Sequence, residues 1–241
     1  MAFLADPEFL LRGLGIIVIN LILSGDNALV IAMAVRTLPP RQRLFGQIGG
    51  TIGAVVLRLV FIAVIAQLLR IPFVEAAGGL ILVWIALKLV RQDGGEGEGE
   101  GKVRHGTTLW EAMWIIIVAD LIMSLDNVLA IAAAARGDLI LVIFGIGLSI
   151  PIVIWGSGFL ALLMNRFQWI VWIGGGLIGW VAGEMMVKDR IVVGWIEPWK
   201  EVLRWVVPAA LGLALTGLGW WLARRARALE SAPVGTAGAE E

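Results

Sequence analysis

The chain has 241 residues, of which 59% are hydrophobic, and its mean hydropathy is +0.91. A water-soluble domain cannot bury that much apolar surface in one core, so the composition indicates an integral membrane protein. Basic and acidic residues balance at 19 each and cysteine is absent, which argues against a nucleic-acid partner and excludes disulfides and thiolate metal sites.

Seven apolar segments are long enough to cross a bilayer as helices. In chain order they cover residues 9–35, 45–69, 72–91, 109–135, 138–164, 168–187 and 204–224. No basic region precedes the first segment, so we expect it to be a retained helix and not a cleaved signal peptide. The expected fold is therefore an all-α, multi-pass membrane protein.

The polar stretches between these segments suggest how the chain is divided. Residues 92–108 form a Gly/Glu-rich linker between a first three-helix unit, residues 1–91, and a second one, residues 109–189. Residues 190–227 hold a segment with Trp195 and Trp199, which we expect to lie at the membrane interface, followed by the seventh helix. Residues 228–241 are expected to be a disordered tail.

The two three-helix units share a polar motif. The windows 20–32 and 120–132 agree at eight of thirteen positions, and Gly-Gly-Leu-Ile occurs at both 78–81 and 175–178. A three-helix unit crosses the membrane an odd number of times, so its repeat must enter from the other side. The pattern predicts two inverted repeats plus one C-terminal helix, a common transporter plan in which substrate sites lie near the midplane between the repeats.

Each copy of the motif places carboxylate and amide groups inside an apolar helix, where an ionised Asp costs about 3 kcal/mol. Such oxygen ligands favour hard divalent cations such as Mg²⁺, Ca²⁺ or Mn²⁺. A buried Asp without a cation tends to bind a proton, so a cation/proton exchange would use both states. The candidate ligands are Asp26, Asn27, Asp120, Asp126 and Asn127, and the candidate supporting residues are Asn20, Ser24 and Ser124.

The helical spacing leaves one ambiguity within the motif. Asn20, Ser24 and Asn27 share one face of an ideal helix, but Asp26 lies about 100° away from Asn27. Either the helix is unwound there, or Asp26 and Asn27 have different neighbours.

Two further charged residues lie within the apolar segments. Arg58 is expected to be a counter-ion of an Asp or a gate that repels a cation. Glu184 is a weaker candidate for the same role, since it lies near a helix end and can reach the interface. Ser24 and Ser124 have the alternative role of interhelical hydrogen bonding.

The distribution of basic residues predicts the orientation. With the N-terminus outside, the cytoplasmic loops carry ten basic residues and the outer loops carry seven, so we expect an outside N-terminus and a cytoplasmic C-terminus.

At these residues the sequence resembles the TerC family of integral membrane proteins, especially its short YjbE-type branch within the lysine-exporter superfamily. The resemblance rests on the segments 20–27 and 120–127 and covers residues 9–189. It implies a seven-helix inner-membrane protein of inverted repeats, linked to manganese efflux and to metal supply for exported enzymes. It also implies that Asp26 and Asp126 are the core metal ligands, with Asn27, Asn127 and Asp120 supporting them.

We therefore expect a secondary transporter, not an enzyme, that exports Mn²⁺ or a similar cation. Its partners would be the bilayer and the transported cation, without a permanently bound cofactor, and the sequence sets no oligomeric state. Three alternatives stay open. They are export of an amino acid or other small solute, a purely structural role, which predicts that both Asp residues tolerate substitution by Asn, and an intramembrane aspartyl protease. The absence of tyrosine and the identical contexts of Asp26 and Asp126 argue against the protease.

Overall fold

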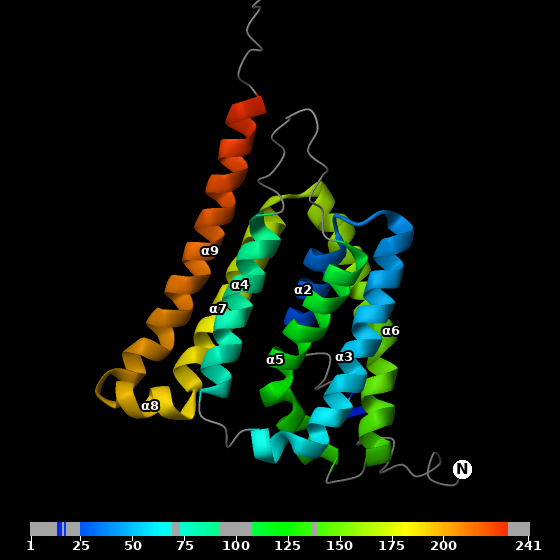
Figure 1. Cartoon of the computed structure of the whole chain (residues 1–241), viewed down its shortest axis with the longest axis vertical. Helices are drawn as coiled ribbons and strands as arrows, with labels where there is room; N and C mark the ends of the chain where they lie inside the picture. Colours follow the sequence, from blue (N-terminus) through cyan, green and yellow to red (C-terminus); the bar gives the residue numbers. More distant parts are fainter. Residues whose placement is uncertain are drawn as a thin grey trace, which may run out of the picture.

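A computed structural model describes residues 14, 15, 17, 25–68, 73–91, 108–135 and 139–230, without the side chains of residues 62–68, 125–135, 139, 141, 144 and 226–230. The described part is helical and contains no strand (Figure 1). Its elements are α2 (Gly25–Val35), α3 (Pro40–Leu68), α4 (Val74–Arg91), α5 (Leu109–Ala135), α6 (Leu139–Arg166), α7 (Trp169–Lys188), α8 (Arg190–Ile196), the 3₁₀ turn η2 (Glu197–Trp199) and α9 (Lys200–Glu230).

The helices follow the predicted apolar segments closely. In the described residues, four stretches meet the length and hydropathy required to cross a membrane: Pro40–Phe61, Gly145–Arg166, Trp169–Lys188 and Arg190–Arg225. The Gly/Glu linker and most of the first predicted helix lie outside the described residues. Helix α9 reaches Glu230, so it includes the start of the segment predicted to be disordered, and the rest of that segment is not described.

Local sequence signals explain where several helices begin. Thr108 and Glu111 form a capping box at the start of α5: Thr108 Oγ1 accepts a hydrogen bond from the Glu111 N–H, and Glu111 Oε2 accepts one from the Thr108 N–H, both at 3.3 Å. Asp189 separates α7 from α8, because its Oδ1 accepts a hydrogen bond from the Ile191 N–H at 2.9 Å. Pro40 is the first residue of α3, a position where its missing N–H costs nothing.

The long helices alternate in direction. In Figure 1 the chain runs upward in α2, α4, α6 and α9 and downward in α3, α5 and α7, so each helix of the first unit is antiparallel to its counterpart in the second. Helix α3 packs chiefly against α5, α6 against α2, and α4 against α7. If each helix is replaced by its counterpart in the other unit, the α3–α5 pair becomes the α6–α2 pair and the α4–α7 pair stays the same.

Glycines allow close approach at the main helix crossings. A Cβ on Gly50 of α3 would lie 2.8 Å from Ile116 Cδ1 of α5. A Cβ on Gly79 of α4 would lie 2.6 Å from the carbonyl oxygen of Ala182 in α7. At both crossings, therefore, a side chain on the glycine would keep the two helices apart.

Helix α9 covers α7 on the outer side of the bundle, and α8 lies across the bundle end at the foot of α9 (Figure 1). The side chains of Trp195 in α8 and Trp199 in η2 are 72% and 67% exposed. Their exposure leaves both indoles accessible, and the position of this segment at the membrane interface stays a prediction.

Candidate functional site

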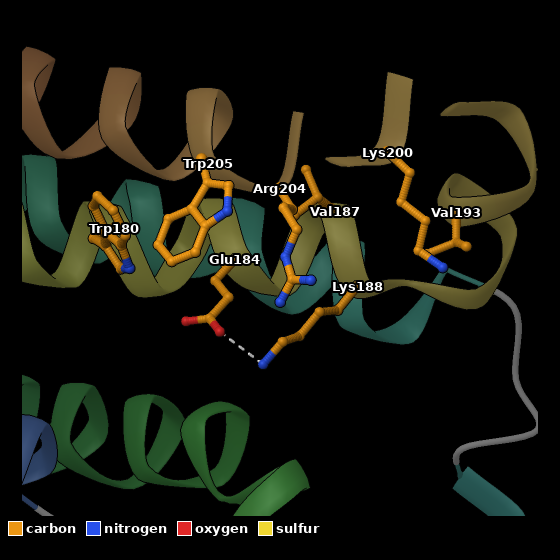
Figure 2. Close-up of a pocket in the computed structure, with 8 residues that line it drawn as sticks. All are labelled: Trp180, Glu184, Val187, Lys188, Val193, Lys200, Arg204 and Trp205. Carbon is orange, nitrogen blue, oxygen red and sulfur yellow. Dashed lines mark ion pairs between the residues drawn. The ribbon is translucent and has the colours of Figure 1, made fainter. Parts of the chain in front are cut away.

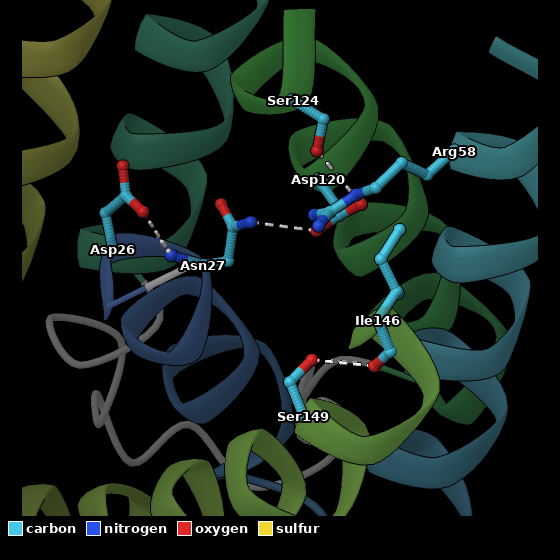
Figure 3. A network of polar contacts seen from close by, with 7 residues as sticks. All are labelled: Asp26, Asn27, Arg58, Asp120, Ser124, Ile146 and Ser149. Atoms are coloured by element: carbon cyan, nitrogen blue, oxygen red, sulfur yellow. Dashed lines mark hydrogen bonds and ion pairs between the residues drawn. The ribbon is translucent and has the colours of Figure 1, made fainter. Parts of the chain in front are cut away.

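Asp120, in the middle of α5, is the centre of a buried polar cluster (Figure 3). Its Oδ1 accepts hydrogen bonds from Asn27 Nδ2 of α2 at 2.9 Å and from Arg58 Nη2 of α3 at 2.5 Å. Its Oδ2 accepts one from Ser124 Oγ, one turn further along α5, at 3.3 Å. None of these four residues is more than 9% exposed, so the cluster joins three helices from both units away from solvent.

The packing of α3 against α5 explains how Arg58 reaches Asp120. Gly50 and Gly53 of α3 lie against Ile116 and Ile117 of α5, and the absence of side chains lets the two backbones approach. Arg58 follows Gly53 by five residues on α3, and Asp120 follows Ile117 by three residues on α5. The guanidinium therefore meets the carboxylate inside the bundle, where an intramembrane charge is expected to find its partner.

Asp26 and Asn27 point to different neighbours. Both lie in the first described turn of α2, where Asp26 Oδ1 accepts a hydrogen bond from the Asn27 N–H at 2.9 Å. In Figure 3 the amide nitrogen of Asn27 faces Asp120, whereas Asp26 lies on the other side of Asn27. Of the two alternatives left by the helical spacing, the described residues therefore favour the one in which Asp26 and Asn27 have different neighbours.

One acceptor in the cluster lacks a donor. Asn27 is 3% exposed, and its Oδ1 has no hydrogen-bond partner in the described part of the chain. A buried carbonyl oxygen without a donor is costly, and an adjacent cation would satisfy it. This oxygen and the carboxylate of the adjacent Asp26 are therefore candidate ligands for a cation.

Comparison with known proteins identifies the family of the chain. The model of the integral membrane protein TerC family matches residues 5–227, which include both motifs and the seventh helix. The chain belongs to the TerC family. The predicted resemblance is thus confirmed.

Several members are similar to this TerC chain. The membrane protein YjbE of Bacillus subtilis (strain 168) is 40% identical over 185 residues, covering 77% of the chain and 83% of YjbE. The membrane protein YceF of the same organism is 31% identical, covering 54% of the chain and 53% of YceF. The inner membrane protein YgdQ of Escherichia coli (strain K12) is 29% identical, covering 53% of the chain and 60% of YgdQ. No solved structure matches the chain.

The remaining motif residues of this TerC chain fall in two groups. Asn20 and Ser24 lie outside the described residues. Asp126 and Asn127 lie within α5, past Ser124, but their side chains are not described. In the described residues no three His, Cys, Asp or Glu side chains lie close enough to hold a metal ion.

The structure brings Arg58, but not Glu184, to the cluster. Arg58 forms an ion pair with Asp120, which is the counter-ion arrangement predicted for it. Glu184 of α7 instead pairs with Lys188, one turn along the same helix, at 2.8 Å between Oε1 and Nζ. It faces a separate pocket beside α9 (Figure 2).

Two buried polar residues of this TerC chain were missed by sequence reasoning. Arg36 is one of the ten basic residues assigned above to the cytoplasmic loops, but it is 4% exposed and its Nη2 donates to the carbonyl oxygen of Leu89 at the end of α4. Its recurrence as Arg136 in the second unit was the available signal. Asp189 is 2% exposed and accepts a hydrogen bond from the Ala76 N–H of α4 as well as capping α8.

Proposed function

We propose that this chain is a secondary transporter that exports a hard divalent cation, Mn²⁺ foremost, through an Asp/Asn site between two inverted three-helix repeats. The observation that carries the proposal is the hydrogen bond from Asn27 to Asp120, which joins equivalent motifs of the two units inside an apolar bundle. Substrate sites of inverted-repeat transporters lie at such a junction. The antiparallel directions of equivalent helices and their exchangeable pairings support the inverted arrangement.

Charge balance supports a divalent substrate. The carboxylates of Asp26, Asp120 and Asp126 and the guanidinium of Arg58 sum to −2 when all are ionised, since three negative charges are offset by one positive charge. A dication between them would neutralise the site, and the same charge could be balanced by two protons. This equivalence is the basis for proposing proton exchange.

The proposed ligands are oxygen atoms from both units. Asp26 and the Oδ1 of Asn27 would bind from α2, and Asp120, Asp126 and Asn127 would bind from α5. In this proposal Arg58 keeps part of the charge of Asp120 neutralised, which weakens binding enough for release. The transported cation is the substrate, and the proposal includes no permanently bound cofactor and no enzymatic reaction.

We place the protein in the inner (plasma) membrane with its N-terminus outside and its C-terminus in the cytoplasm. The excess of basic residues in the loops on the C-terminal side supports this orientation. The name of YgdQ supports the inner membrane.

Export of an amino acid is the second candidate, because of the ion pair between Arg58 and Asp120. A zwitterion presents one charge of each sign, so its carboxylate could bind Arg58 while its ammonium group binds Asp120. A guanidinium is positively charged and has no acceptor atom, so it cannot be a ligand of a divalent cation.

The test is Mn²⁺ flux in proteoliposomes, with Mg²⁺, Ca²⁺ and lysine as competitors. We expect wild type to move Mn²⁺, Asp26→Asn and Asp126→Asn to abolish flux in folded protein, and the control Glu184→Gln to retain it, because Glu184 lies outside the cluster. If neither Asp substitution changes the flux, the carboxylates are structural. If lysine moves and no divalent cation does, the second candidate replaces the first.

A further inference from the structure

A pocket of about 340 Å³ lies between α7, α8 and α9, apart from the polar cluster (Figure 2). Its lining has two chemically distinct parts. The indoles of Trp180 and Trp205, with ring centroids 6.3 Å apart, form an apolar part together with Val187. Lys188, Lys200 and Arg204 form a basic part.

The basic part carries more positive charge than its neighbours neutralise. Glu184 is the one acidic residue of the lining and pairs with Lys188. The Nη1 of Arg204 is 3.9 Å from Glu201 Oε2, the outer limit of an ion pair, and both side chains are more than half exposed. Lys200 has no carboxylate partner in the described residues. With three cations and one anion, the lining has a net charge of +2.

The position of the pocket in the fold puts it at the level of lipid headgroups. It lies beside α8, at the end of the bundle where Trp195 and Trp199 are exposed. Tryptophans of this kind mark the boundary between acyl chains and headgroups. In Figure 2 the two indoles of the pocket lie toward one end, and Lys200 lies at the other.

We propose that this pocket binds an anionic phospholipid, with the headgroup phosphate between Lys200 and Arg204 and an acyl chain along Trp180 and Trp205. Lysine and arginine are the usual ligands of phosphate oxygens, and basic pockets at helix ends bind anionic headgroups. A soluble phosphate would use the cations but not the indoles. An amphiphile uses both parts of the lining.

The experiment measures lipid retention by the full-length protein in neutral detergent, using native mass spectrometry with phosphatidylglycerol or phosphatidylcholine. The pocket variant is Lys200→Gln with Arg204→Gln. The matched control is Arg224→Gln with Arg225→Gln, at the other end of α9, where each arginine also lies over an indole ring. All four side chains are exposed, and the single variant Lys200→Gln provides a milder test.

We expect wild type and the control to prefer phosphatidylglycerol, and we expect the pocket variant to lose about fivefold in that preference for each cation removed. An equal loss in the control would overturn the proposal, because the preference would then follow net charge. Full competition by free glycerol phosphate would also overturn it, since the occupant would be a soluble anion. No preference in wild type would have the same consequence.

Discussion

Replacing Arg58 with glutamine should destabilise the protein more than any exposed charge substitution. The Arg58 and Asp120 side chains are 3% and 11% exposed, so the charge of Asp120 would stay buried without its counter-ion. Asn27 and Ser124 would still donate hydrogen bonds to it, but neither carries a charge. Breaking one side of a buried ion pair costs about 3–5 kcal/mol, so we expect a loss of that size in the free energy of unfolding.

The double variant Arg58→Gln with Asp120→Asn isolates the pair. Because it leaves no buried charge at either position, it should be more stable than either single variant. The measurement is reversible unfolding by SDS in mixed micelles, followed by circular dichroism, with Lys188→Gln as the control for an exposed ion pair and an expected loss below about 1 kcal/mol. If the losses of the two single variants add to that of the double variant within about 0.5 kcal/mol, the two side chains are not coupled and the reasoning is wrong.

Two further substitutions test the packing and the capping in the same unfolding assay. Gly176→Ala would place a Cβ 2.9 Å from the carbonyl oxygen of Gly212 in α9 and should lower the free energy of unfolding by about 1–3 kcal/mol. The control Gly217→Ala, whose Cβ would have nothing within 4 Å, should not lower it. Equal losses in the two variants would contradict the close crossing of α7 and α9. Asp189→Ala should cost about 1–2 kcal/mol and speed amide hydrogen exchange at Ile191, and Asp189→Asn should keep most of the cap; unchanged exchange in the alanine variant would show that the cap contributes nothing.

The helices were predictable because a membrane helix is defined by a continuous apolar length. The errors occur at the ends, where hydropathy and helix formation differ. Helix α3 begins at Pro40 and not at residue 45, because Arg41 and Arg43 interrupt the apolar run but are good helix formers. Likewise α9 continues through Arg224 and Arg225.

The polar cluster was predictable in its members but not in its contacts. The repeated motif pointed to Asn27 and Asp120, and the cost of a buried charge pointed to Arg58. Which Asp pairs with Arg58 depends on the packing of α3 against α5, which one sequence does not specify. Arg36 was missed for a related reason, since a charge beside a turn is usually solvated and only the tertiary structure shows its contact with Leu89.

The pairing of α3 with α5 bears on how the protein is made. Arg58 is synthesised 62 residues before Asp120, so α3 enters the membrane during translation before its counter-ion exists. In the interval the guanidinium costs about 3 kcal/mol at the bilayer centre, unless it stays near water or beside the insertion machinery. The ion pair between Arg58 and Asp120 is therefore completed only when α5 joins the helices that are made before it.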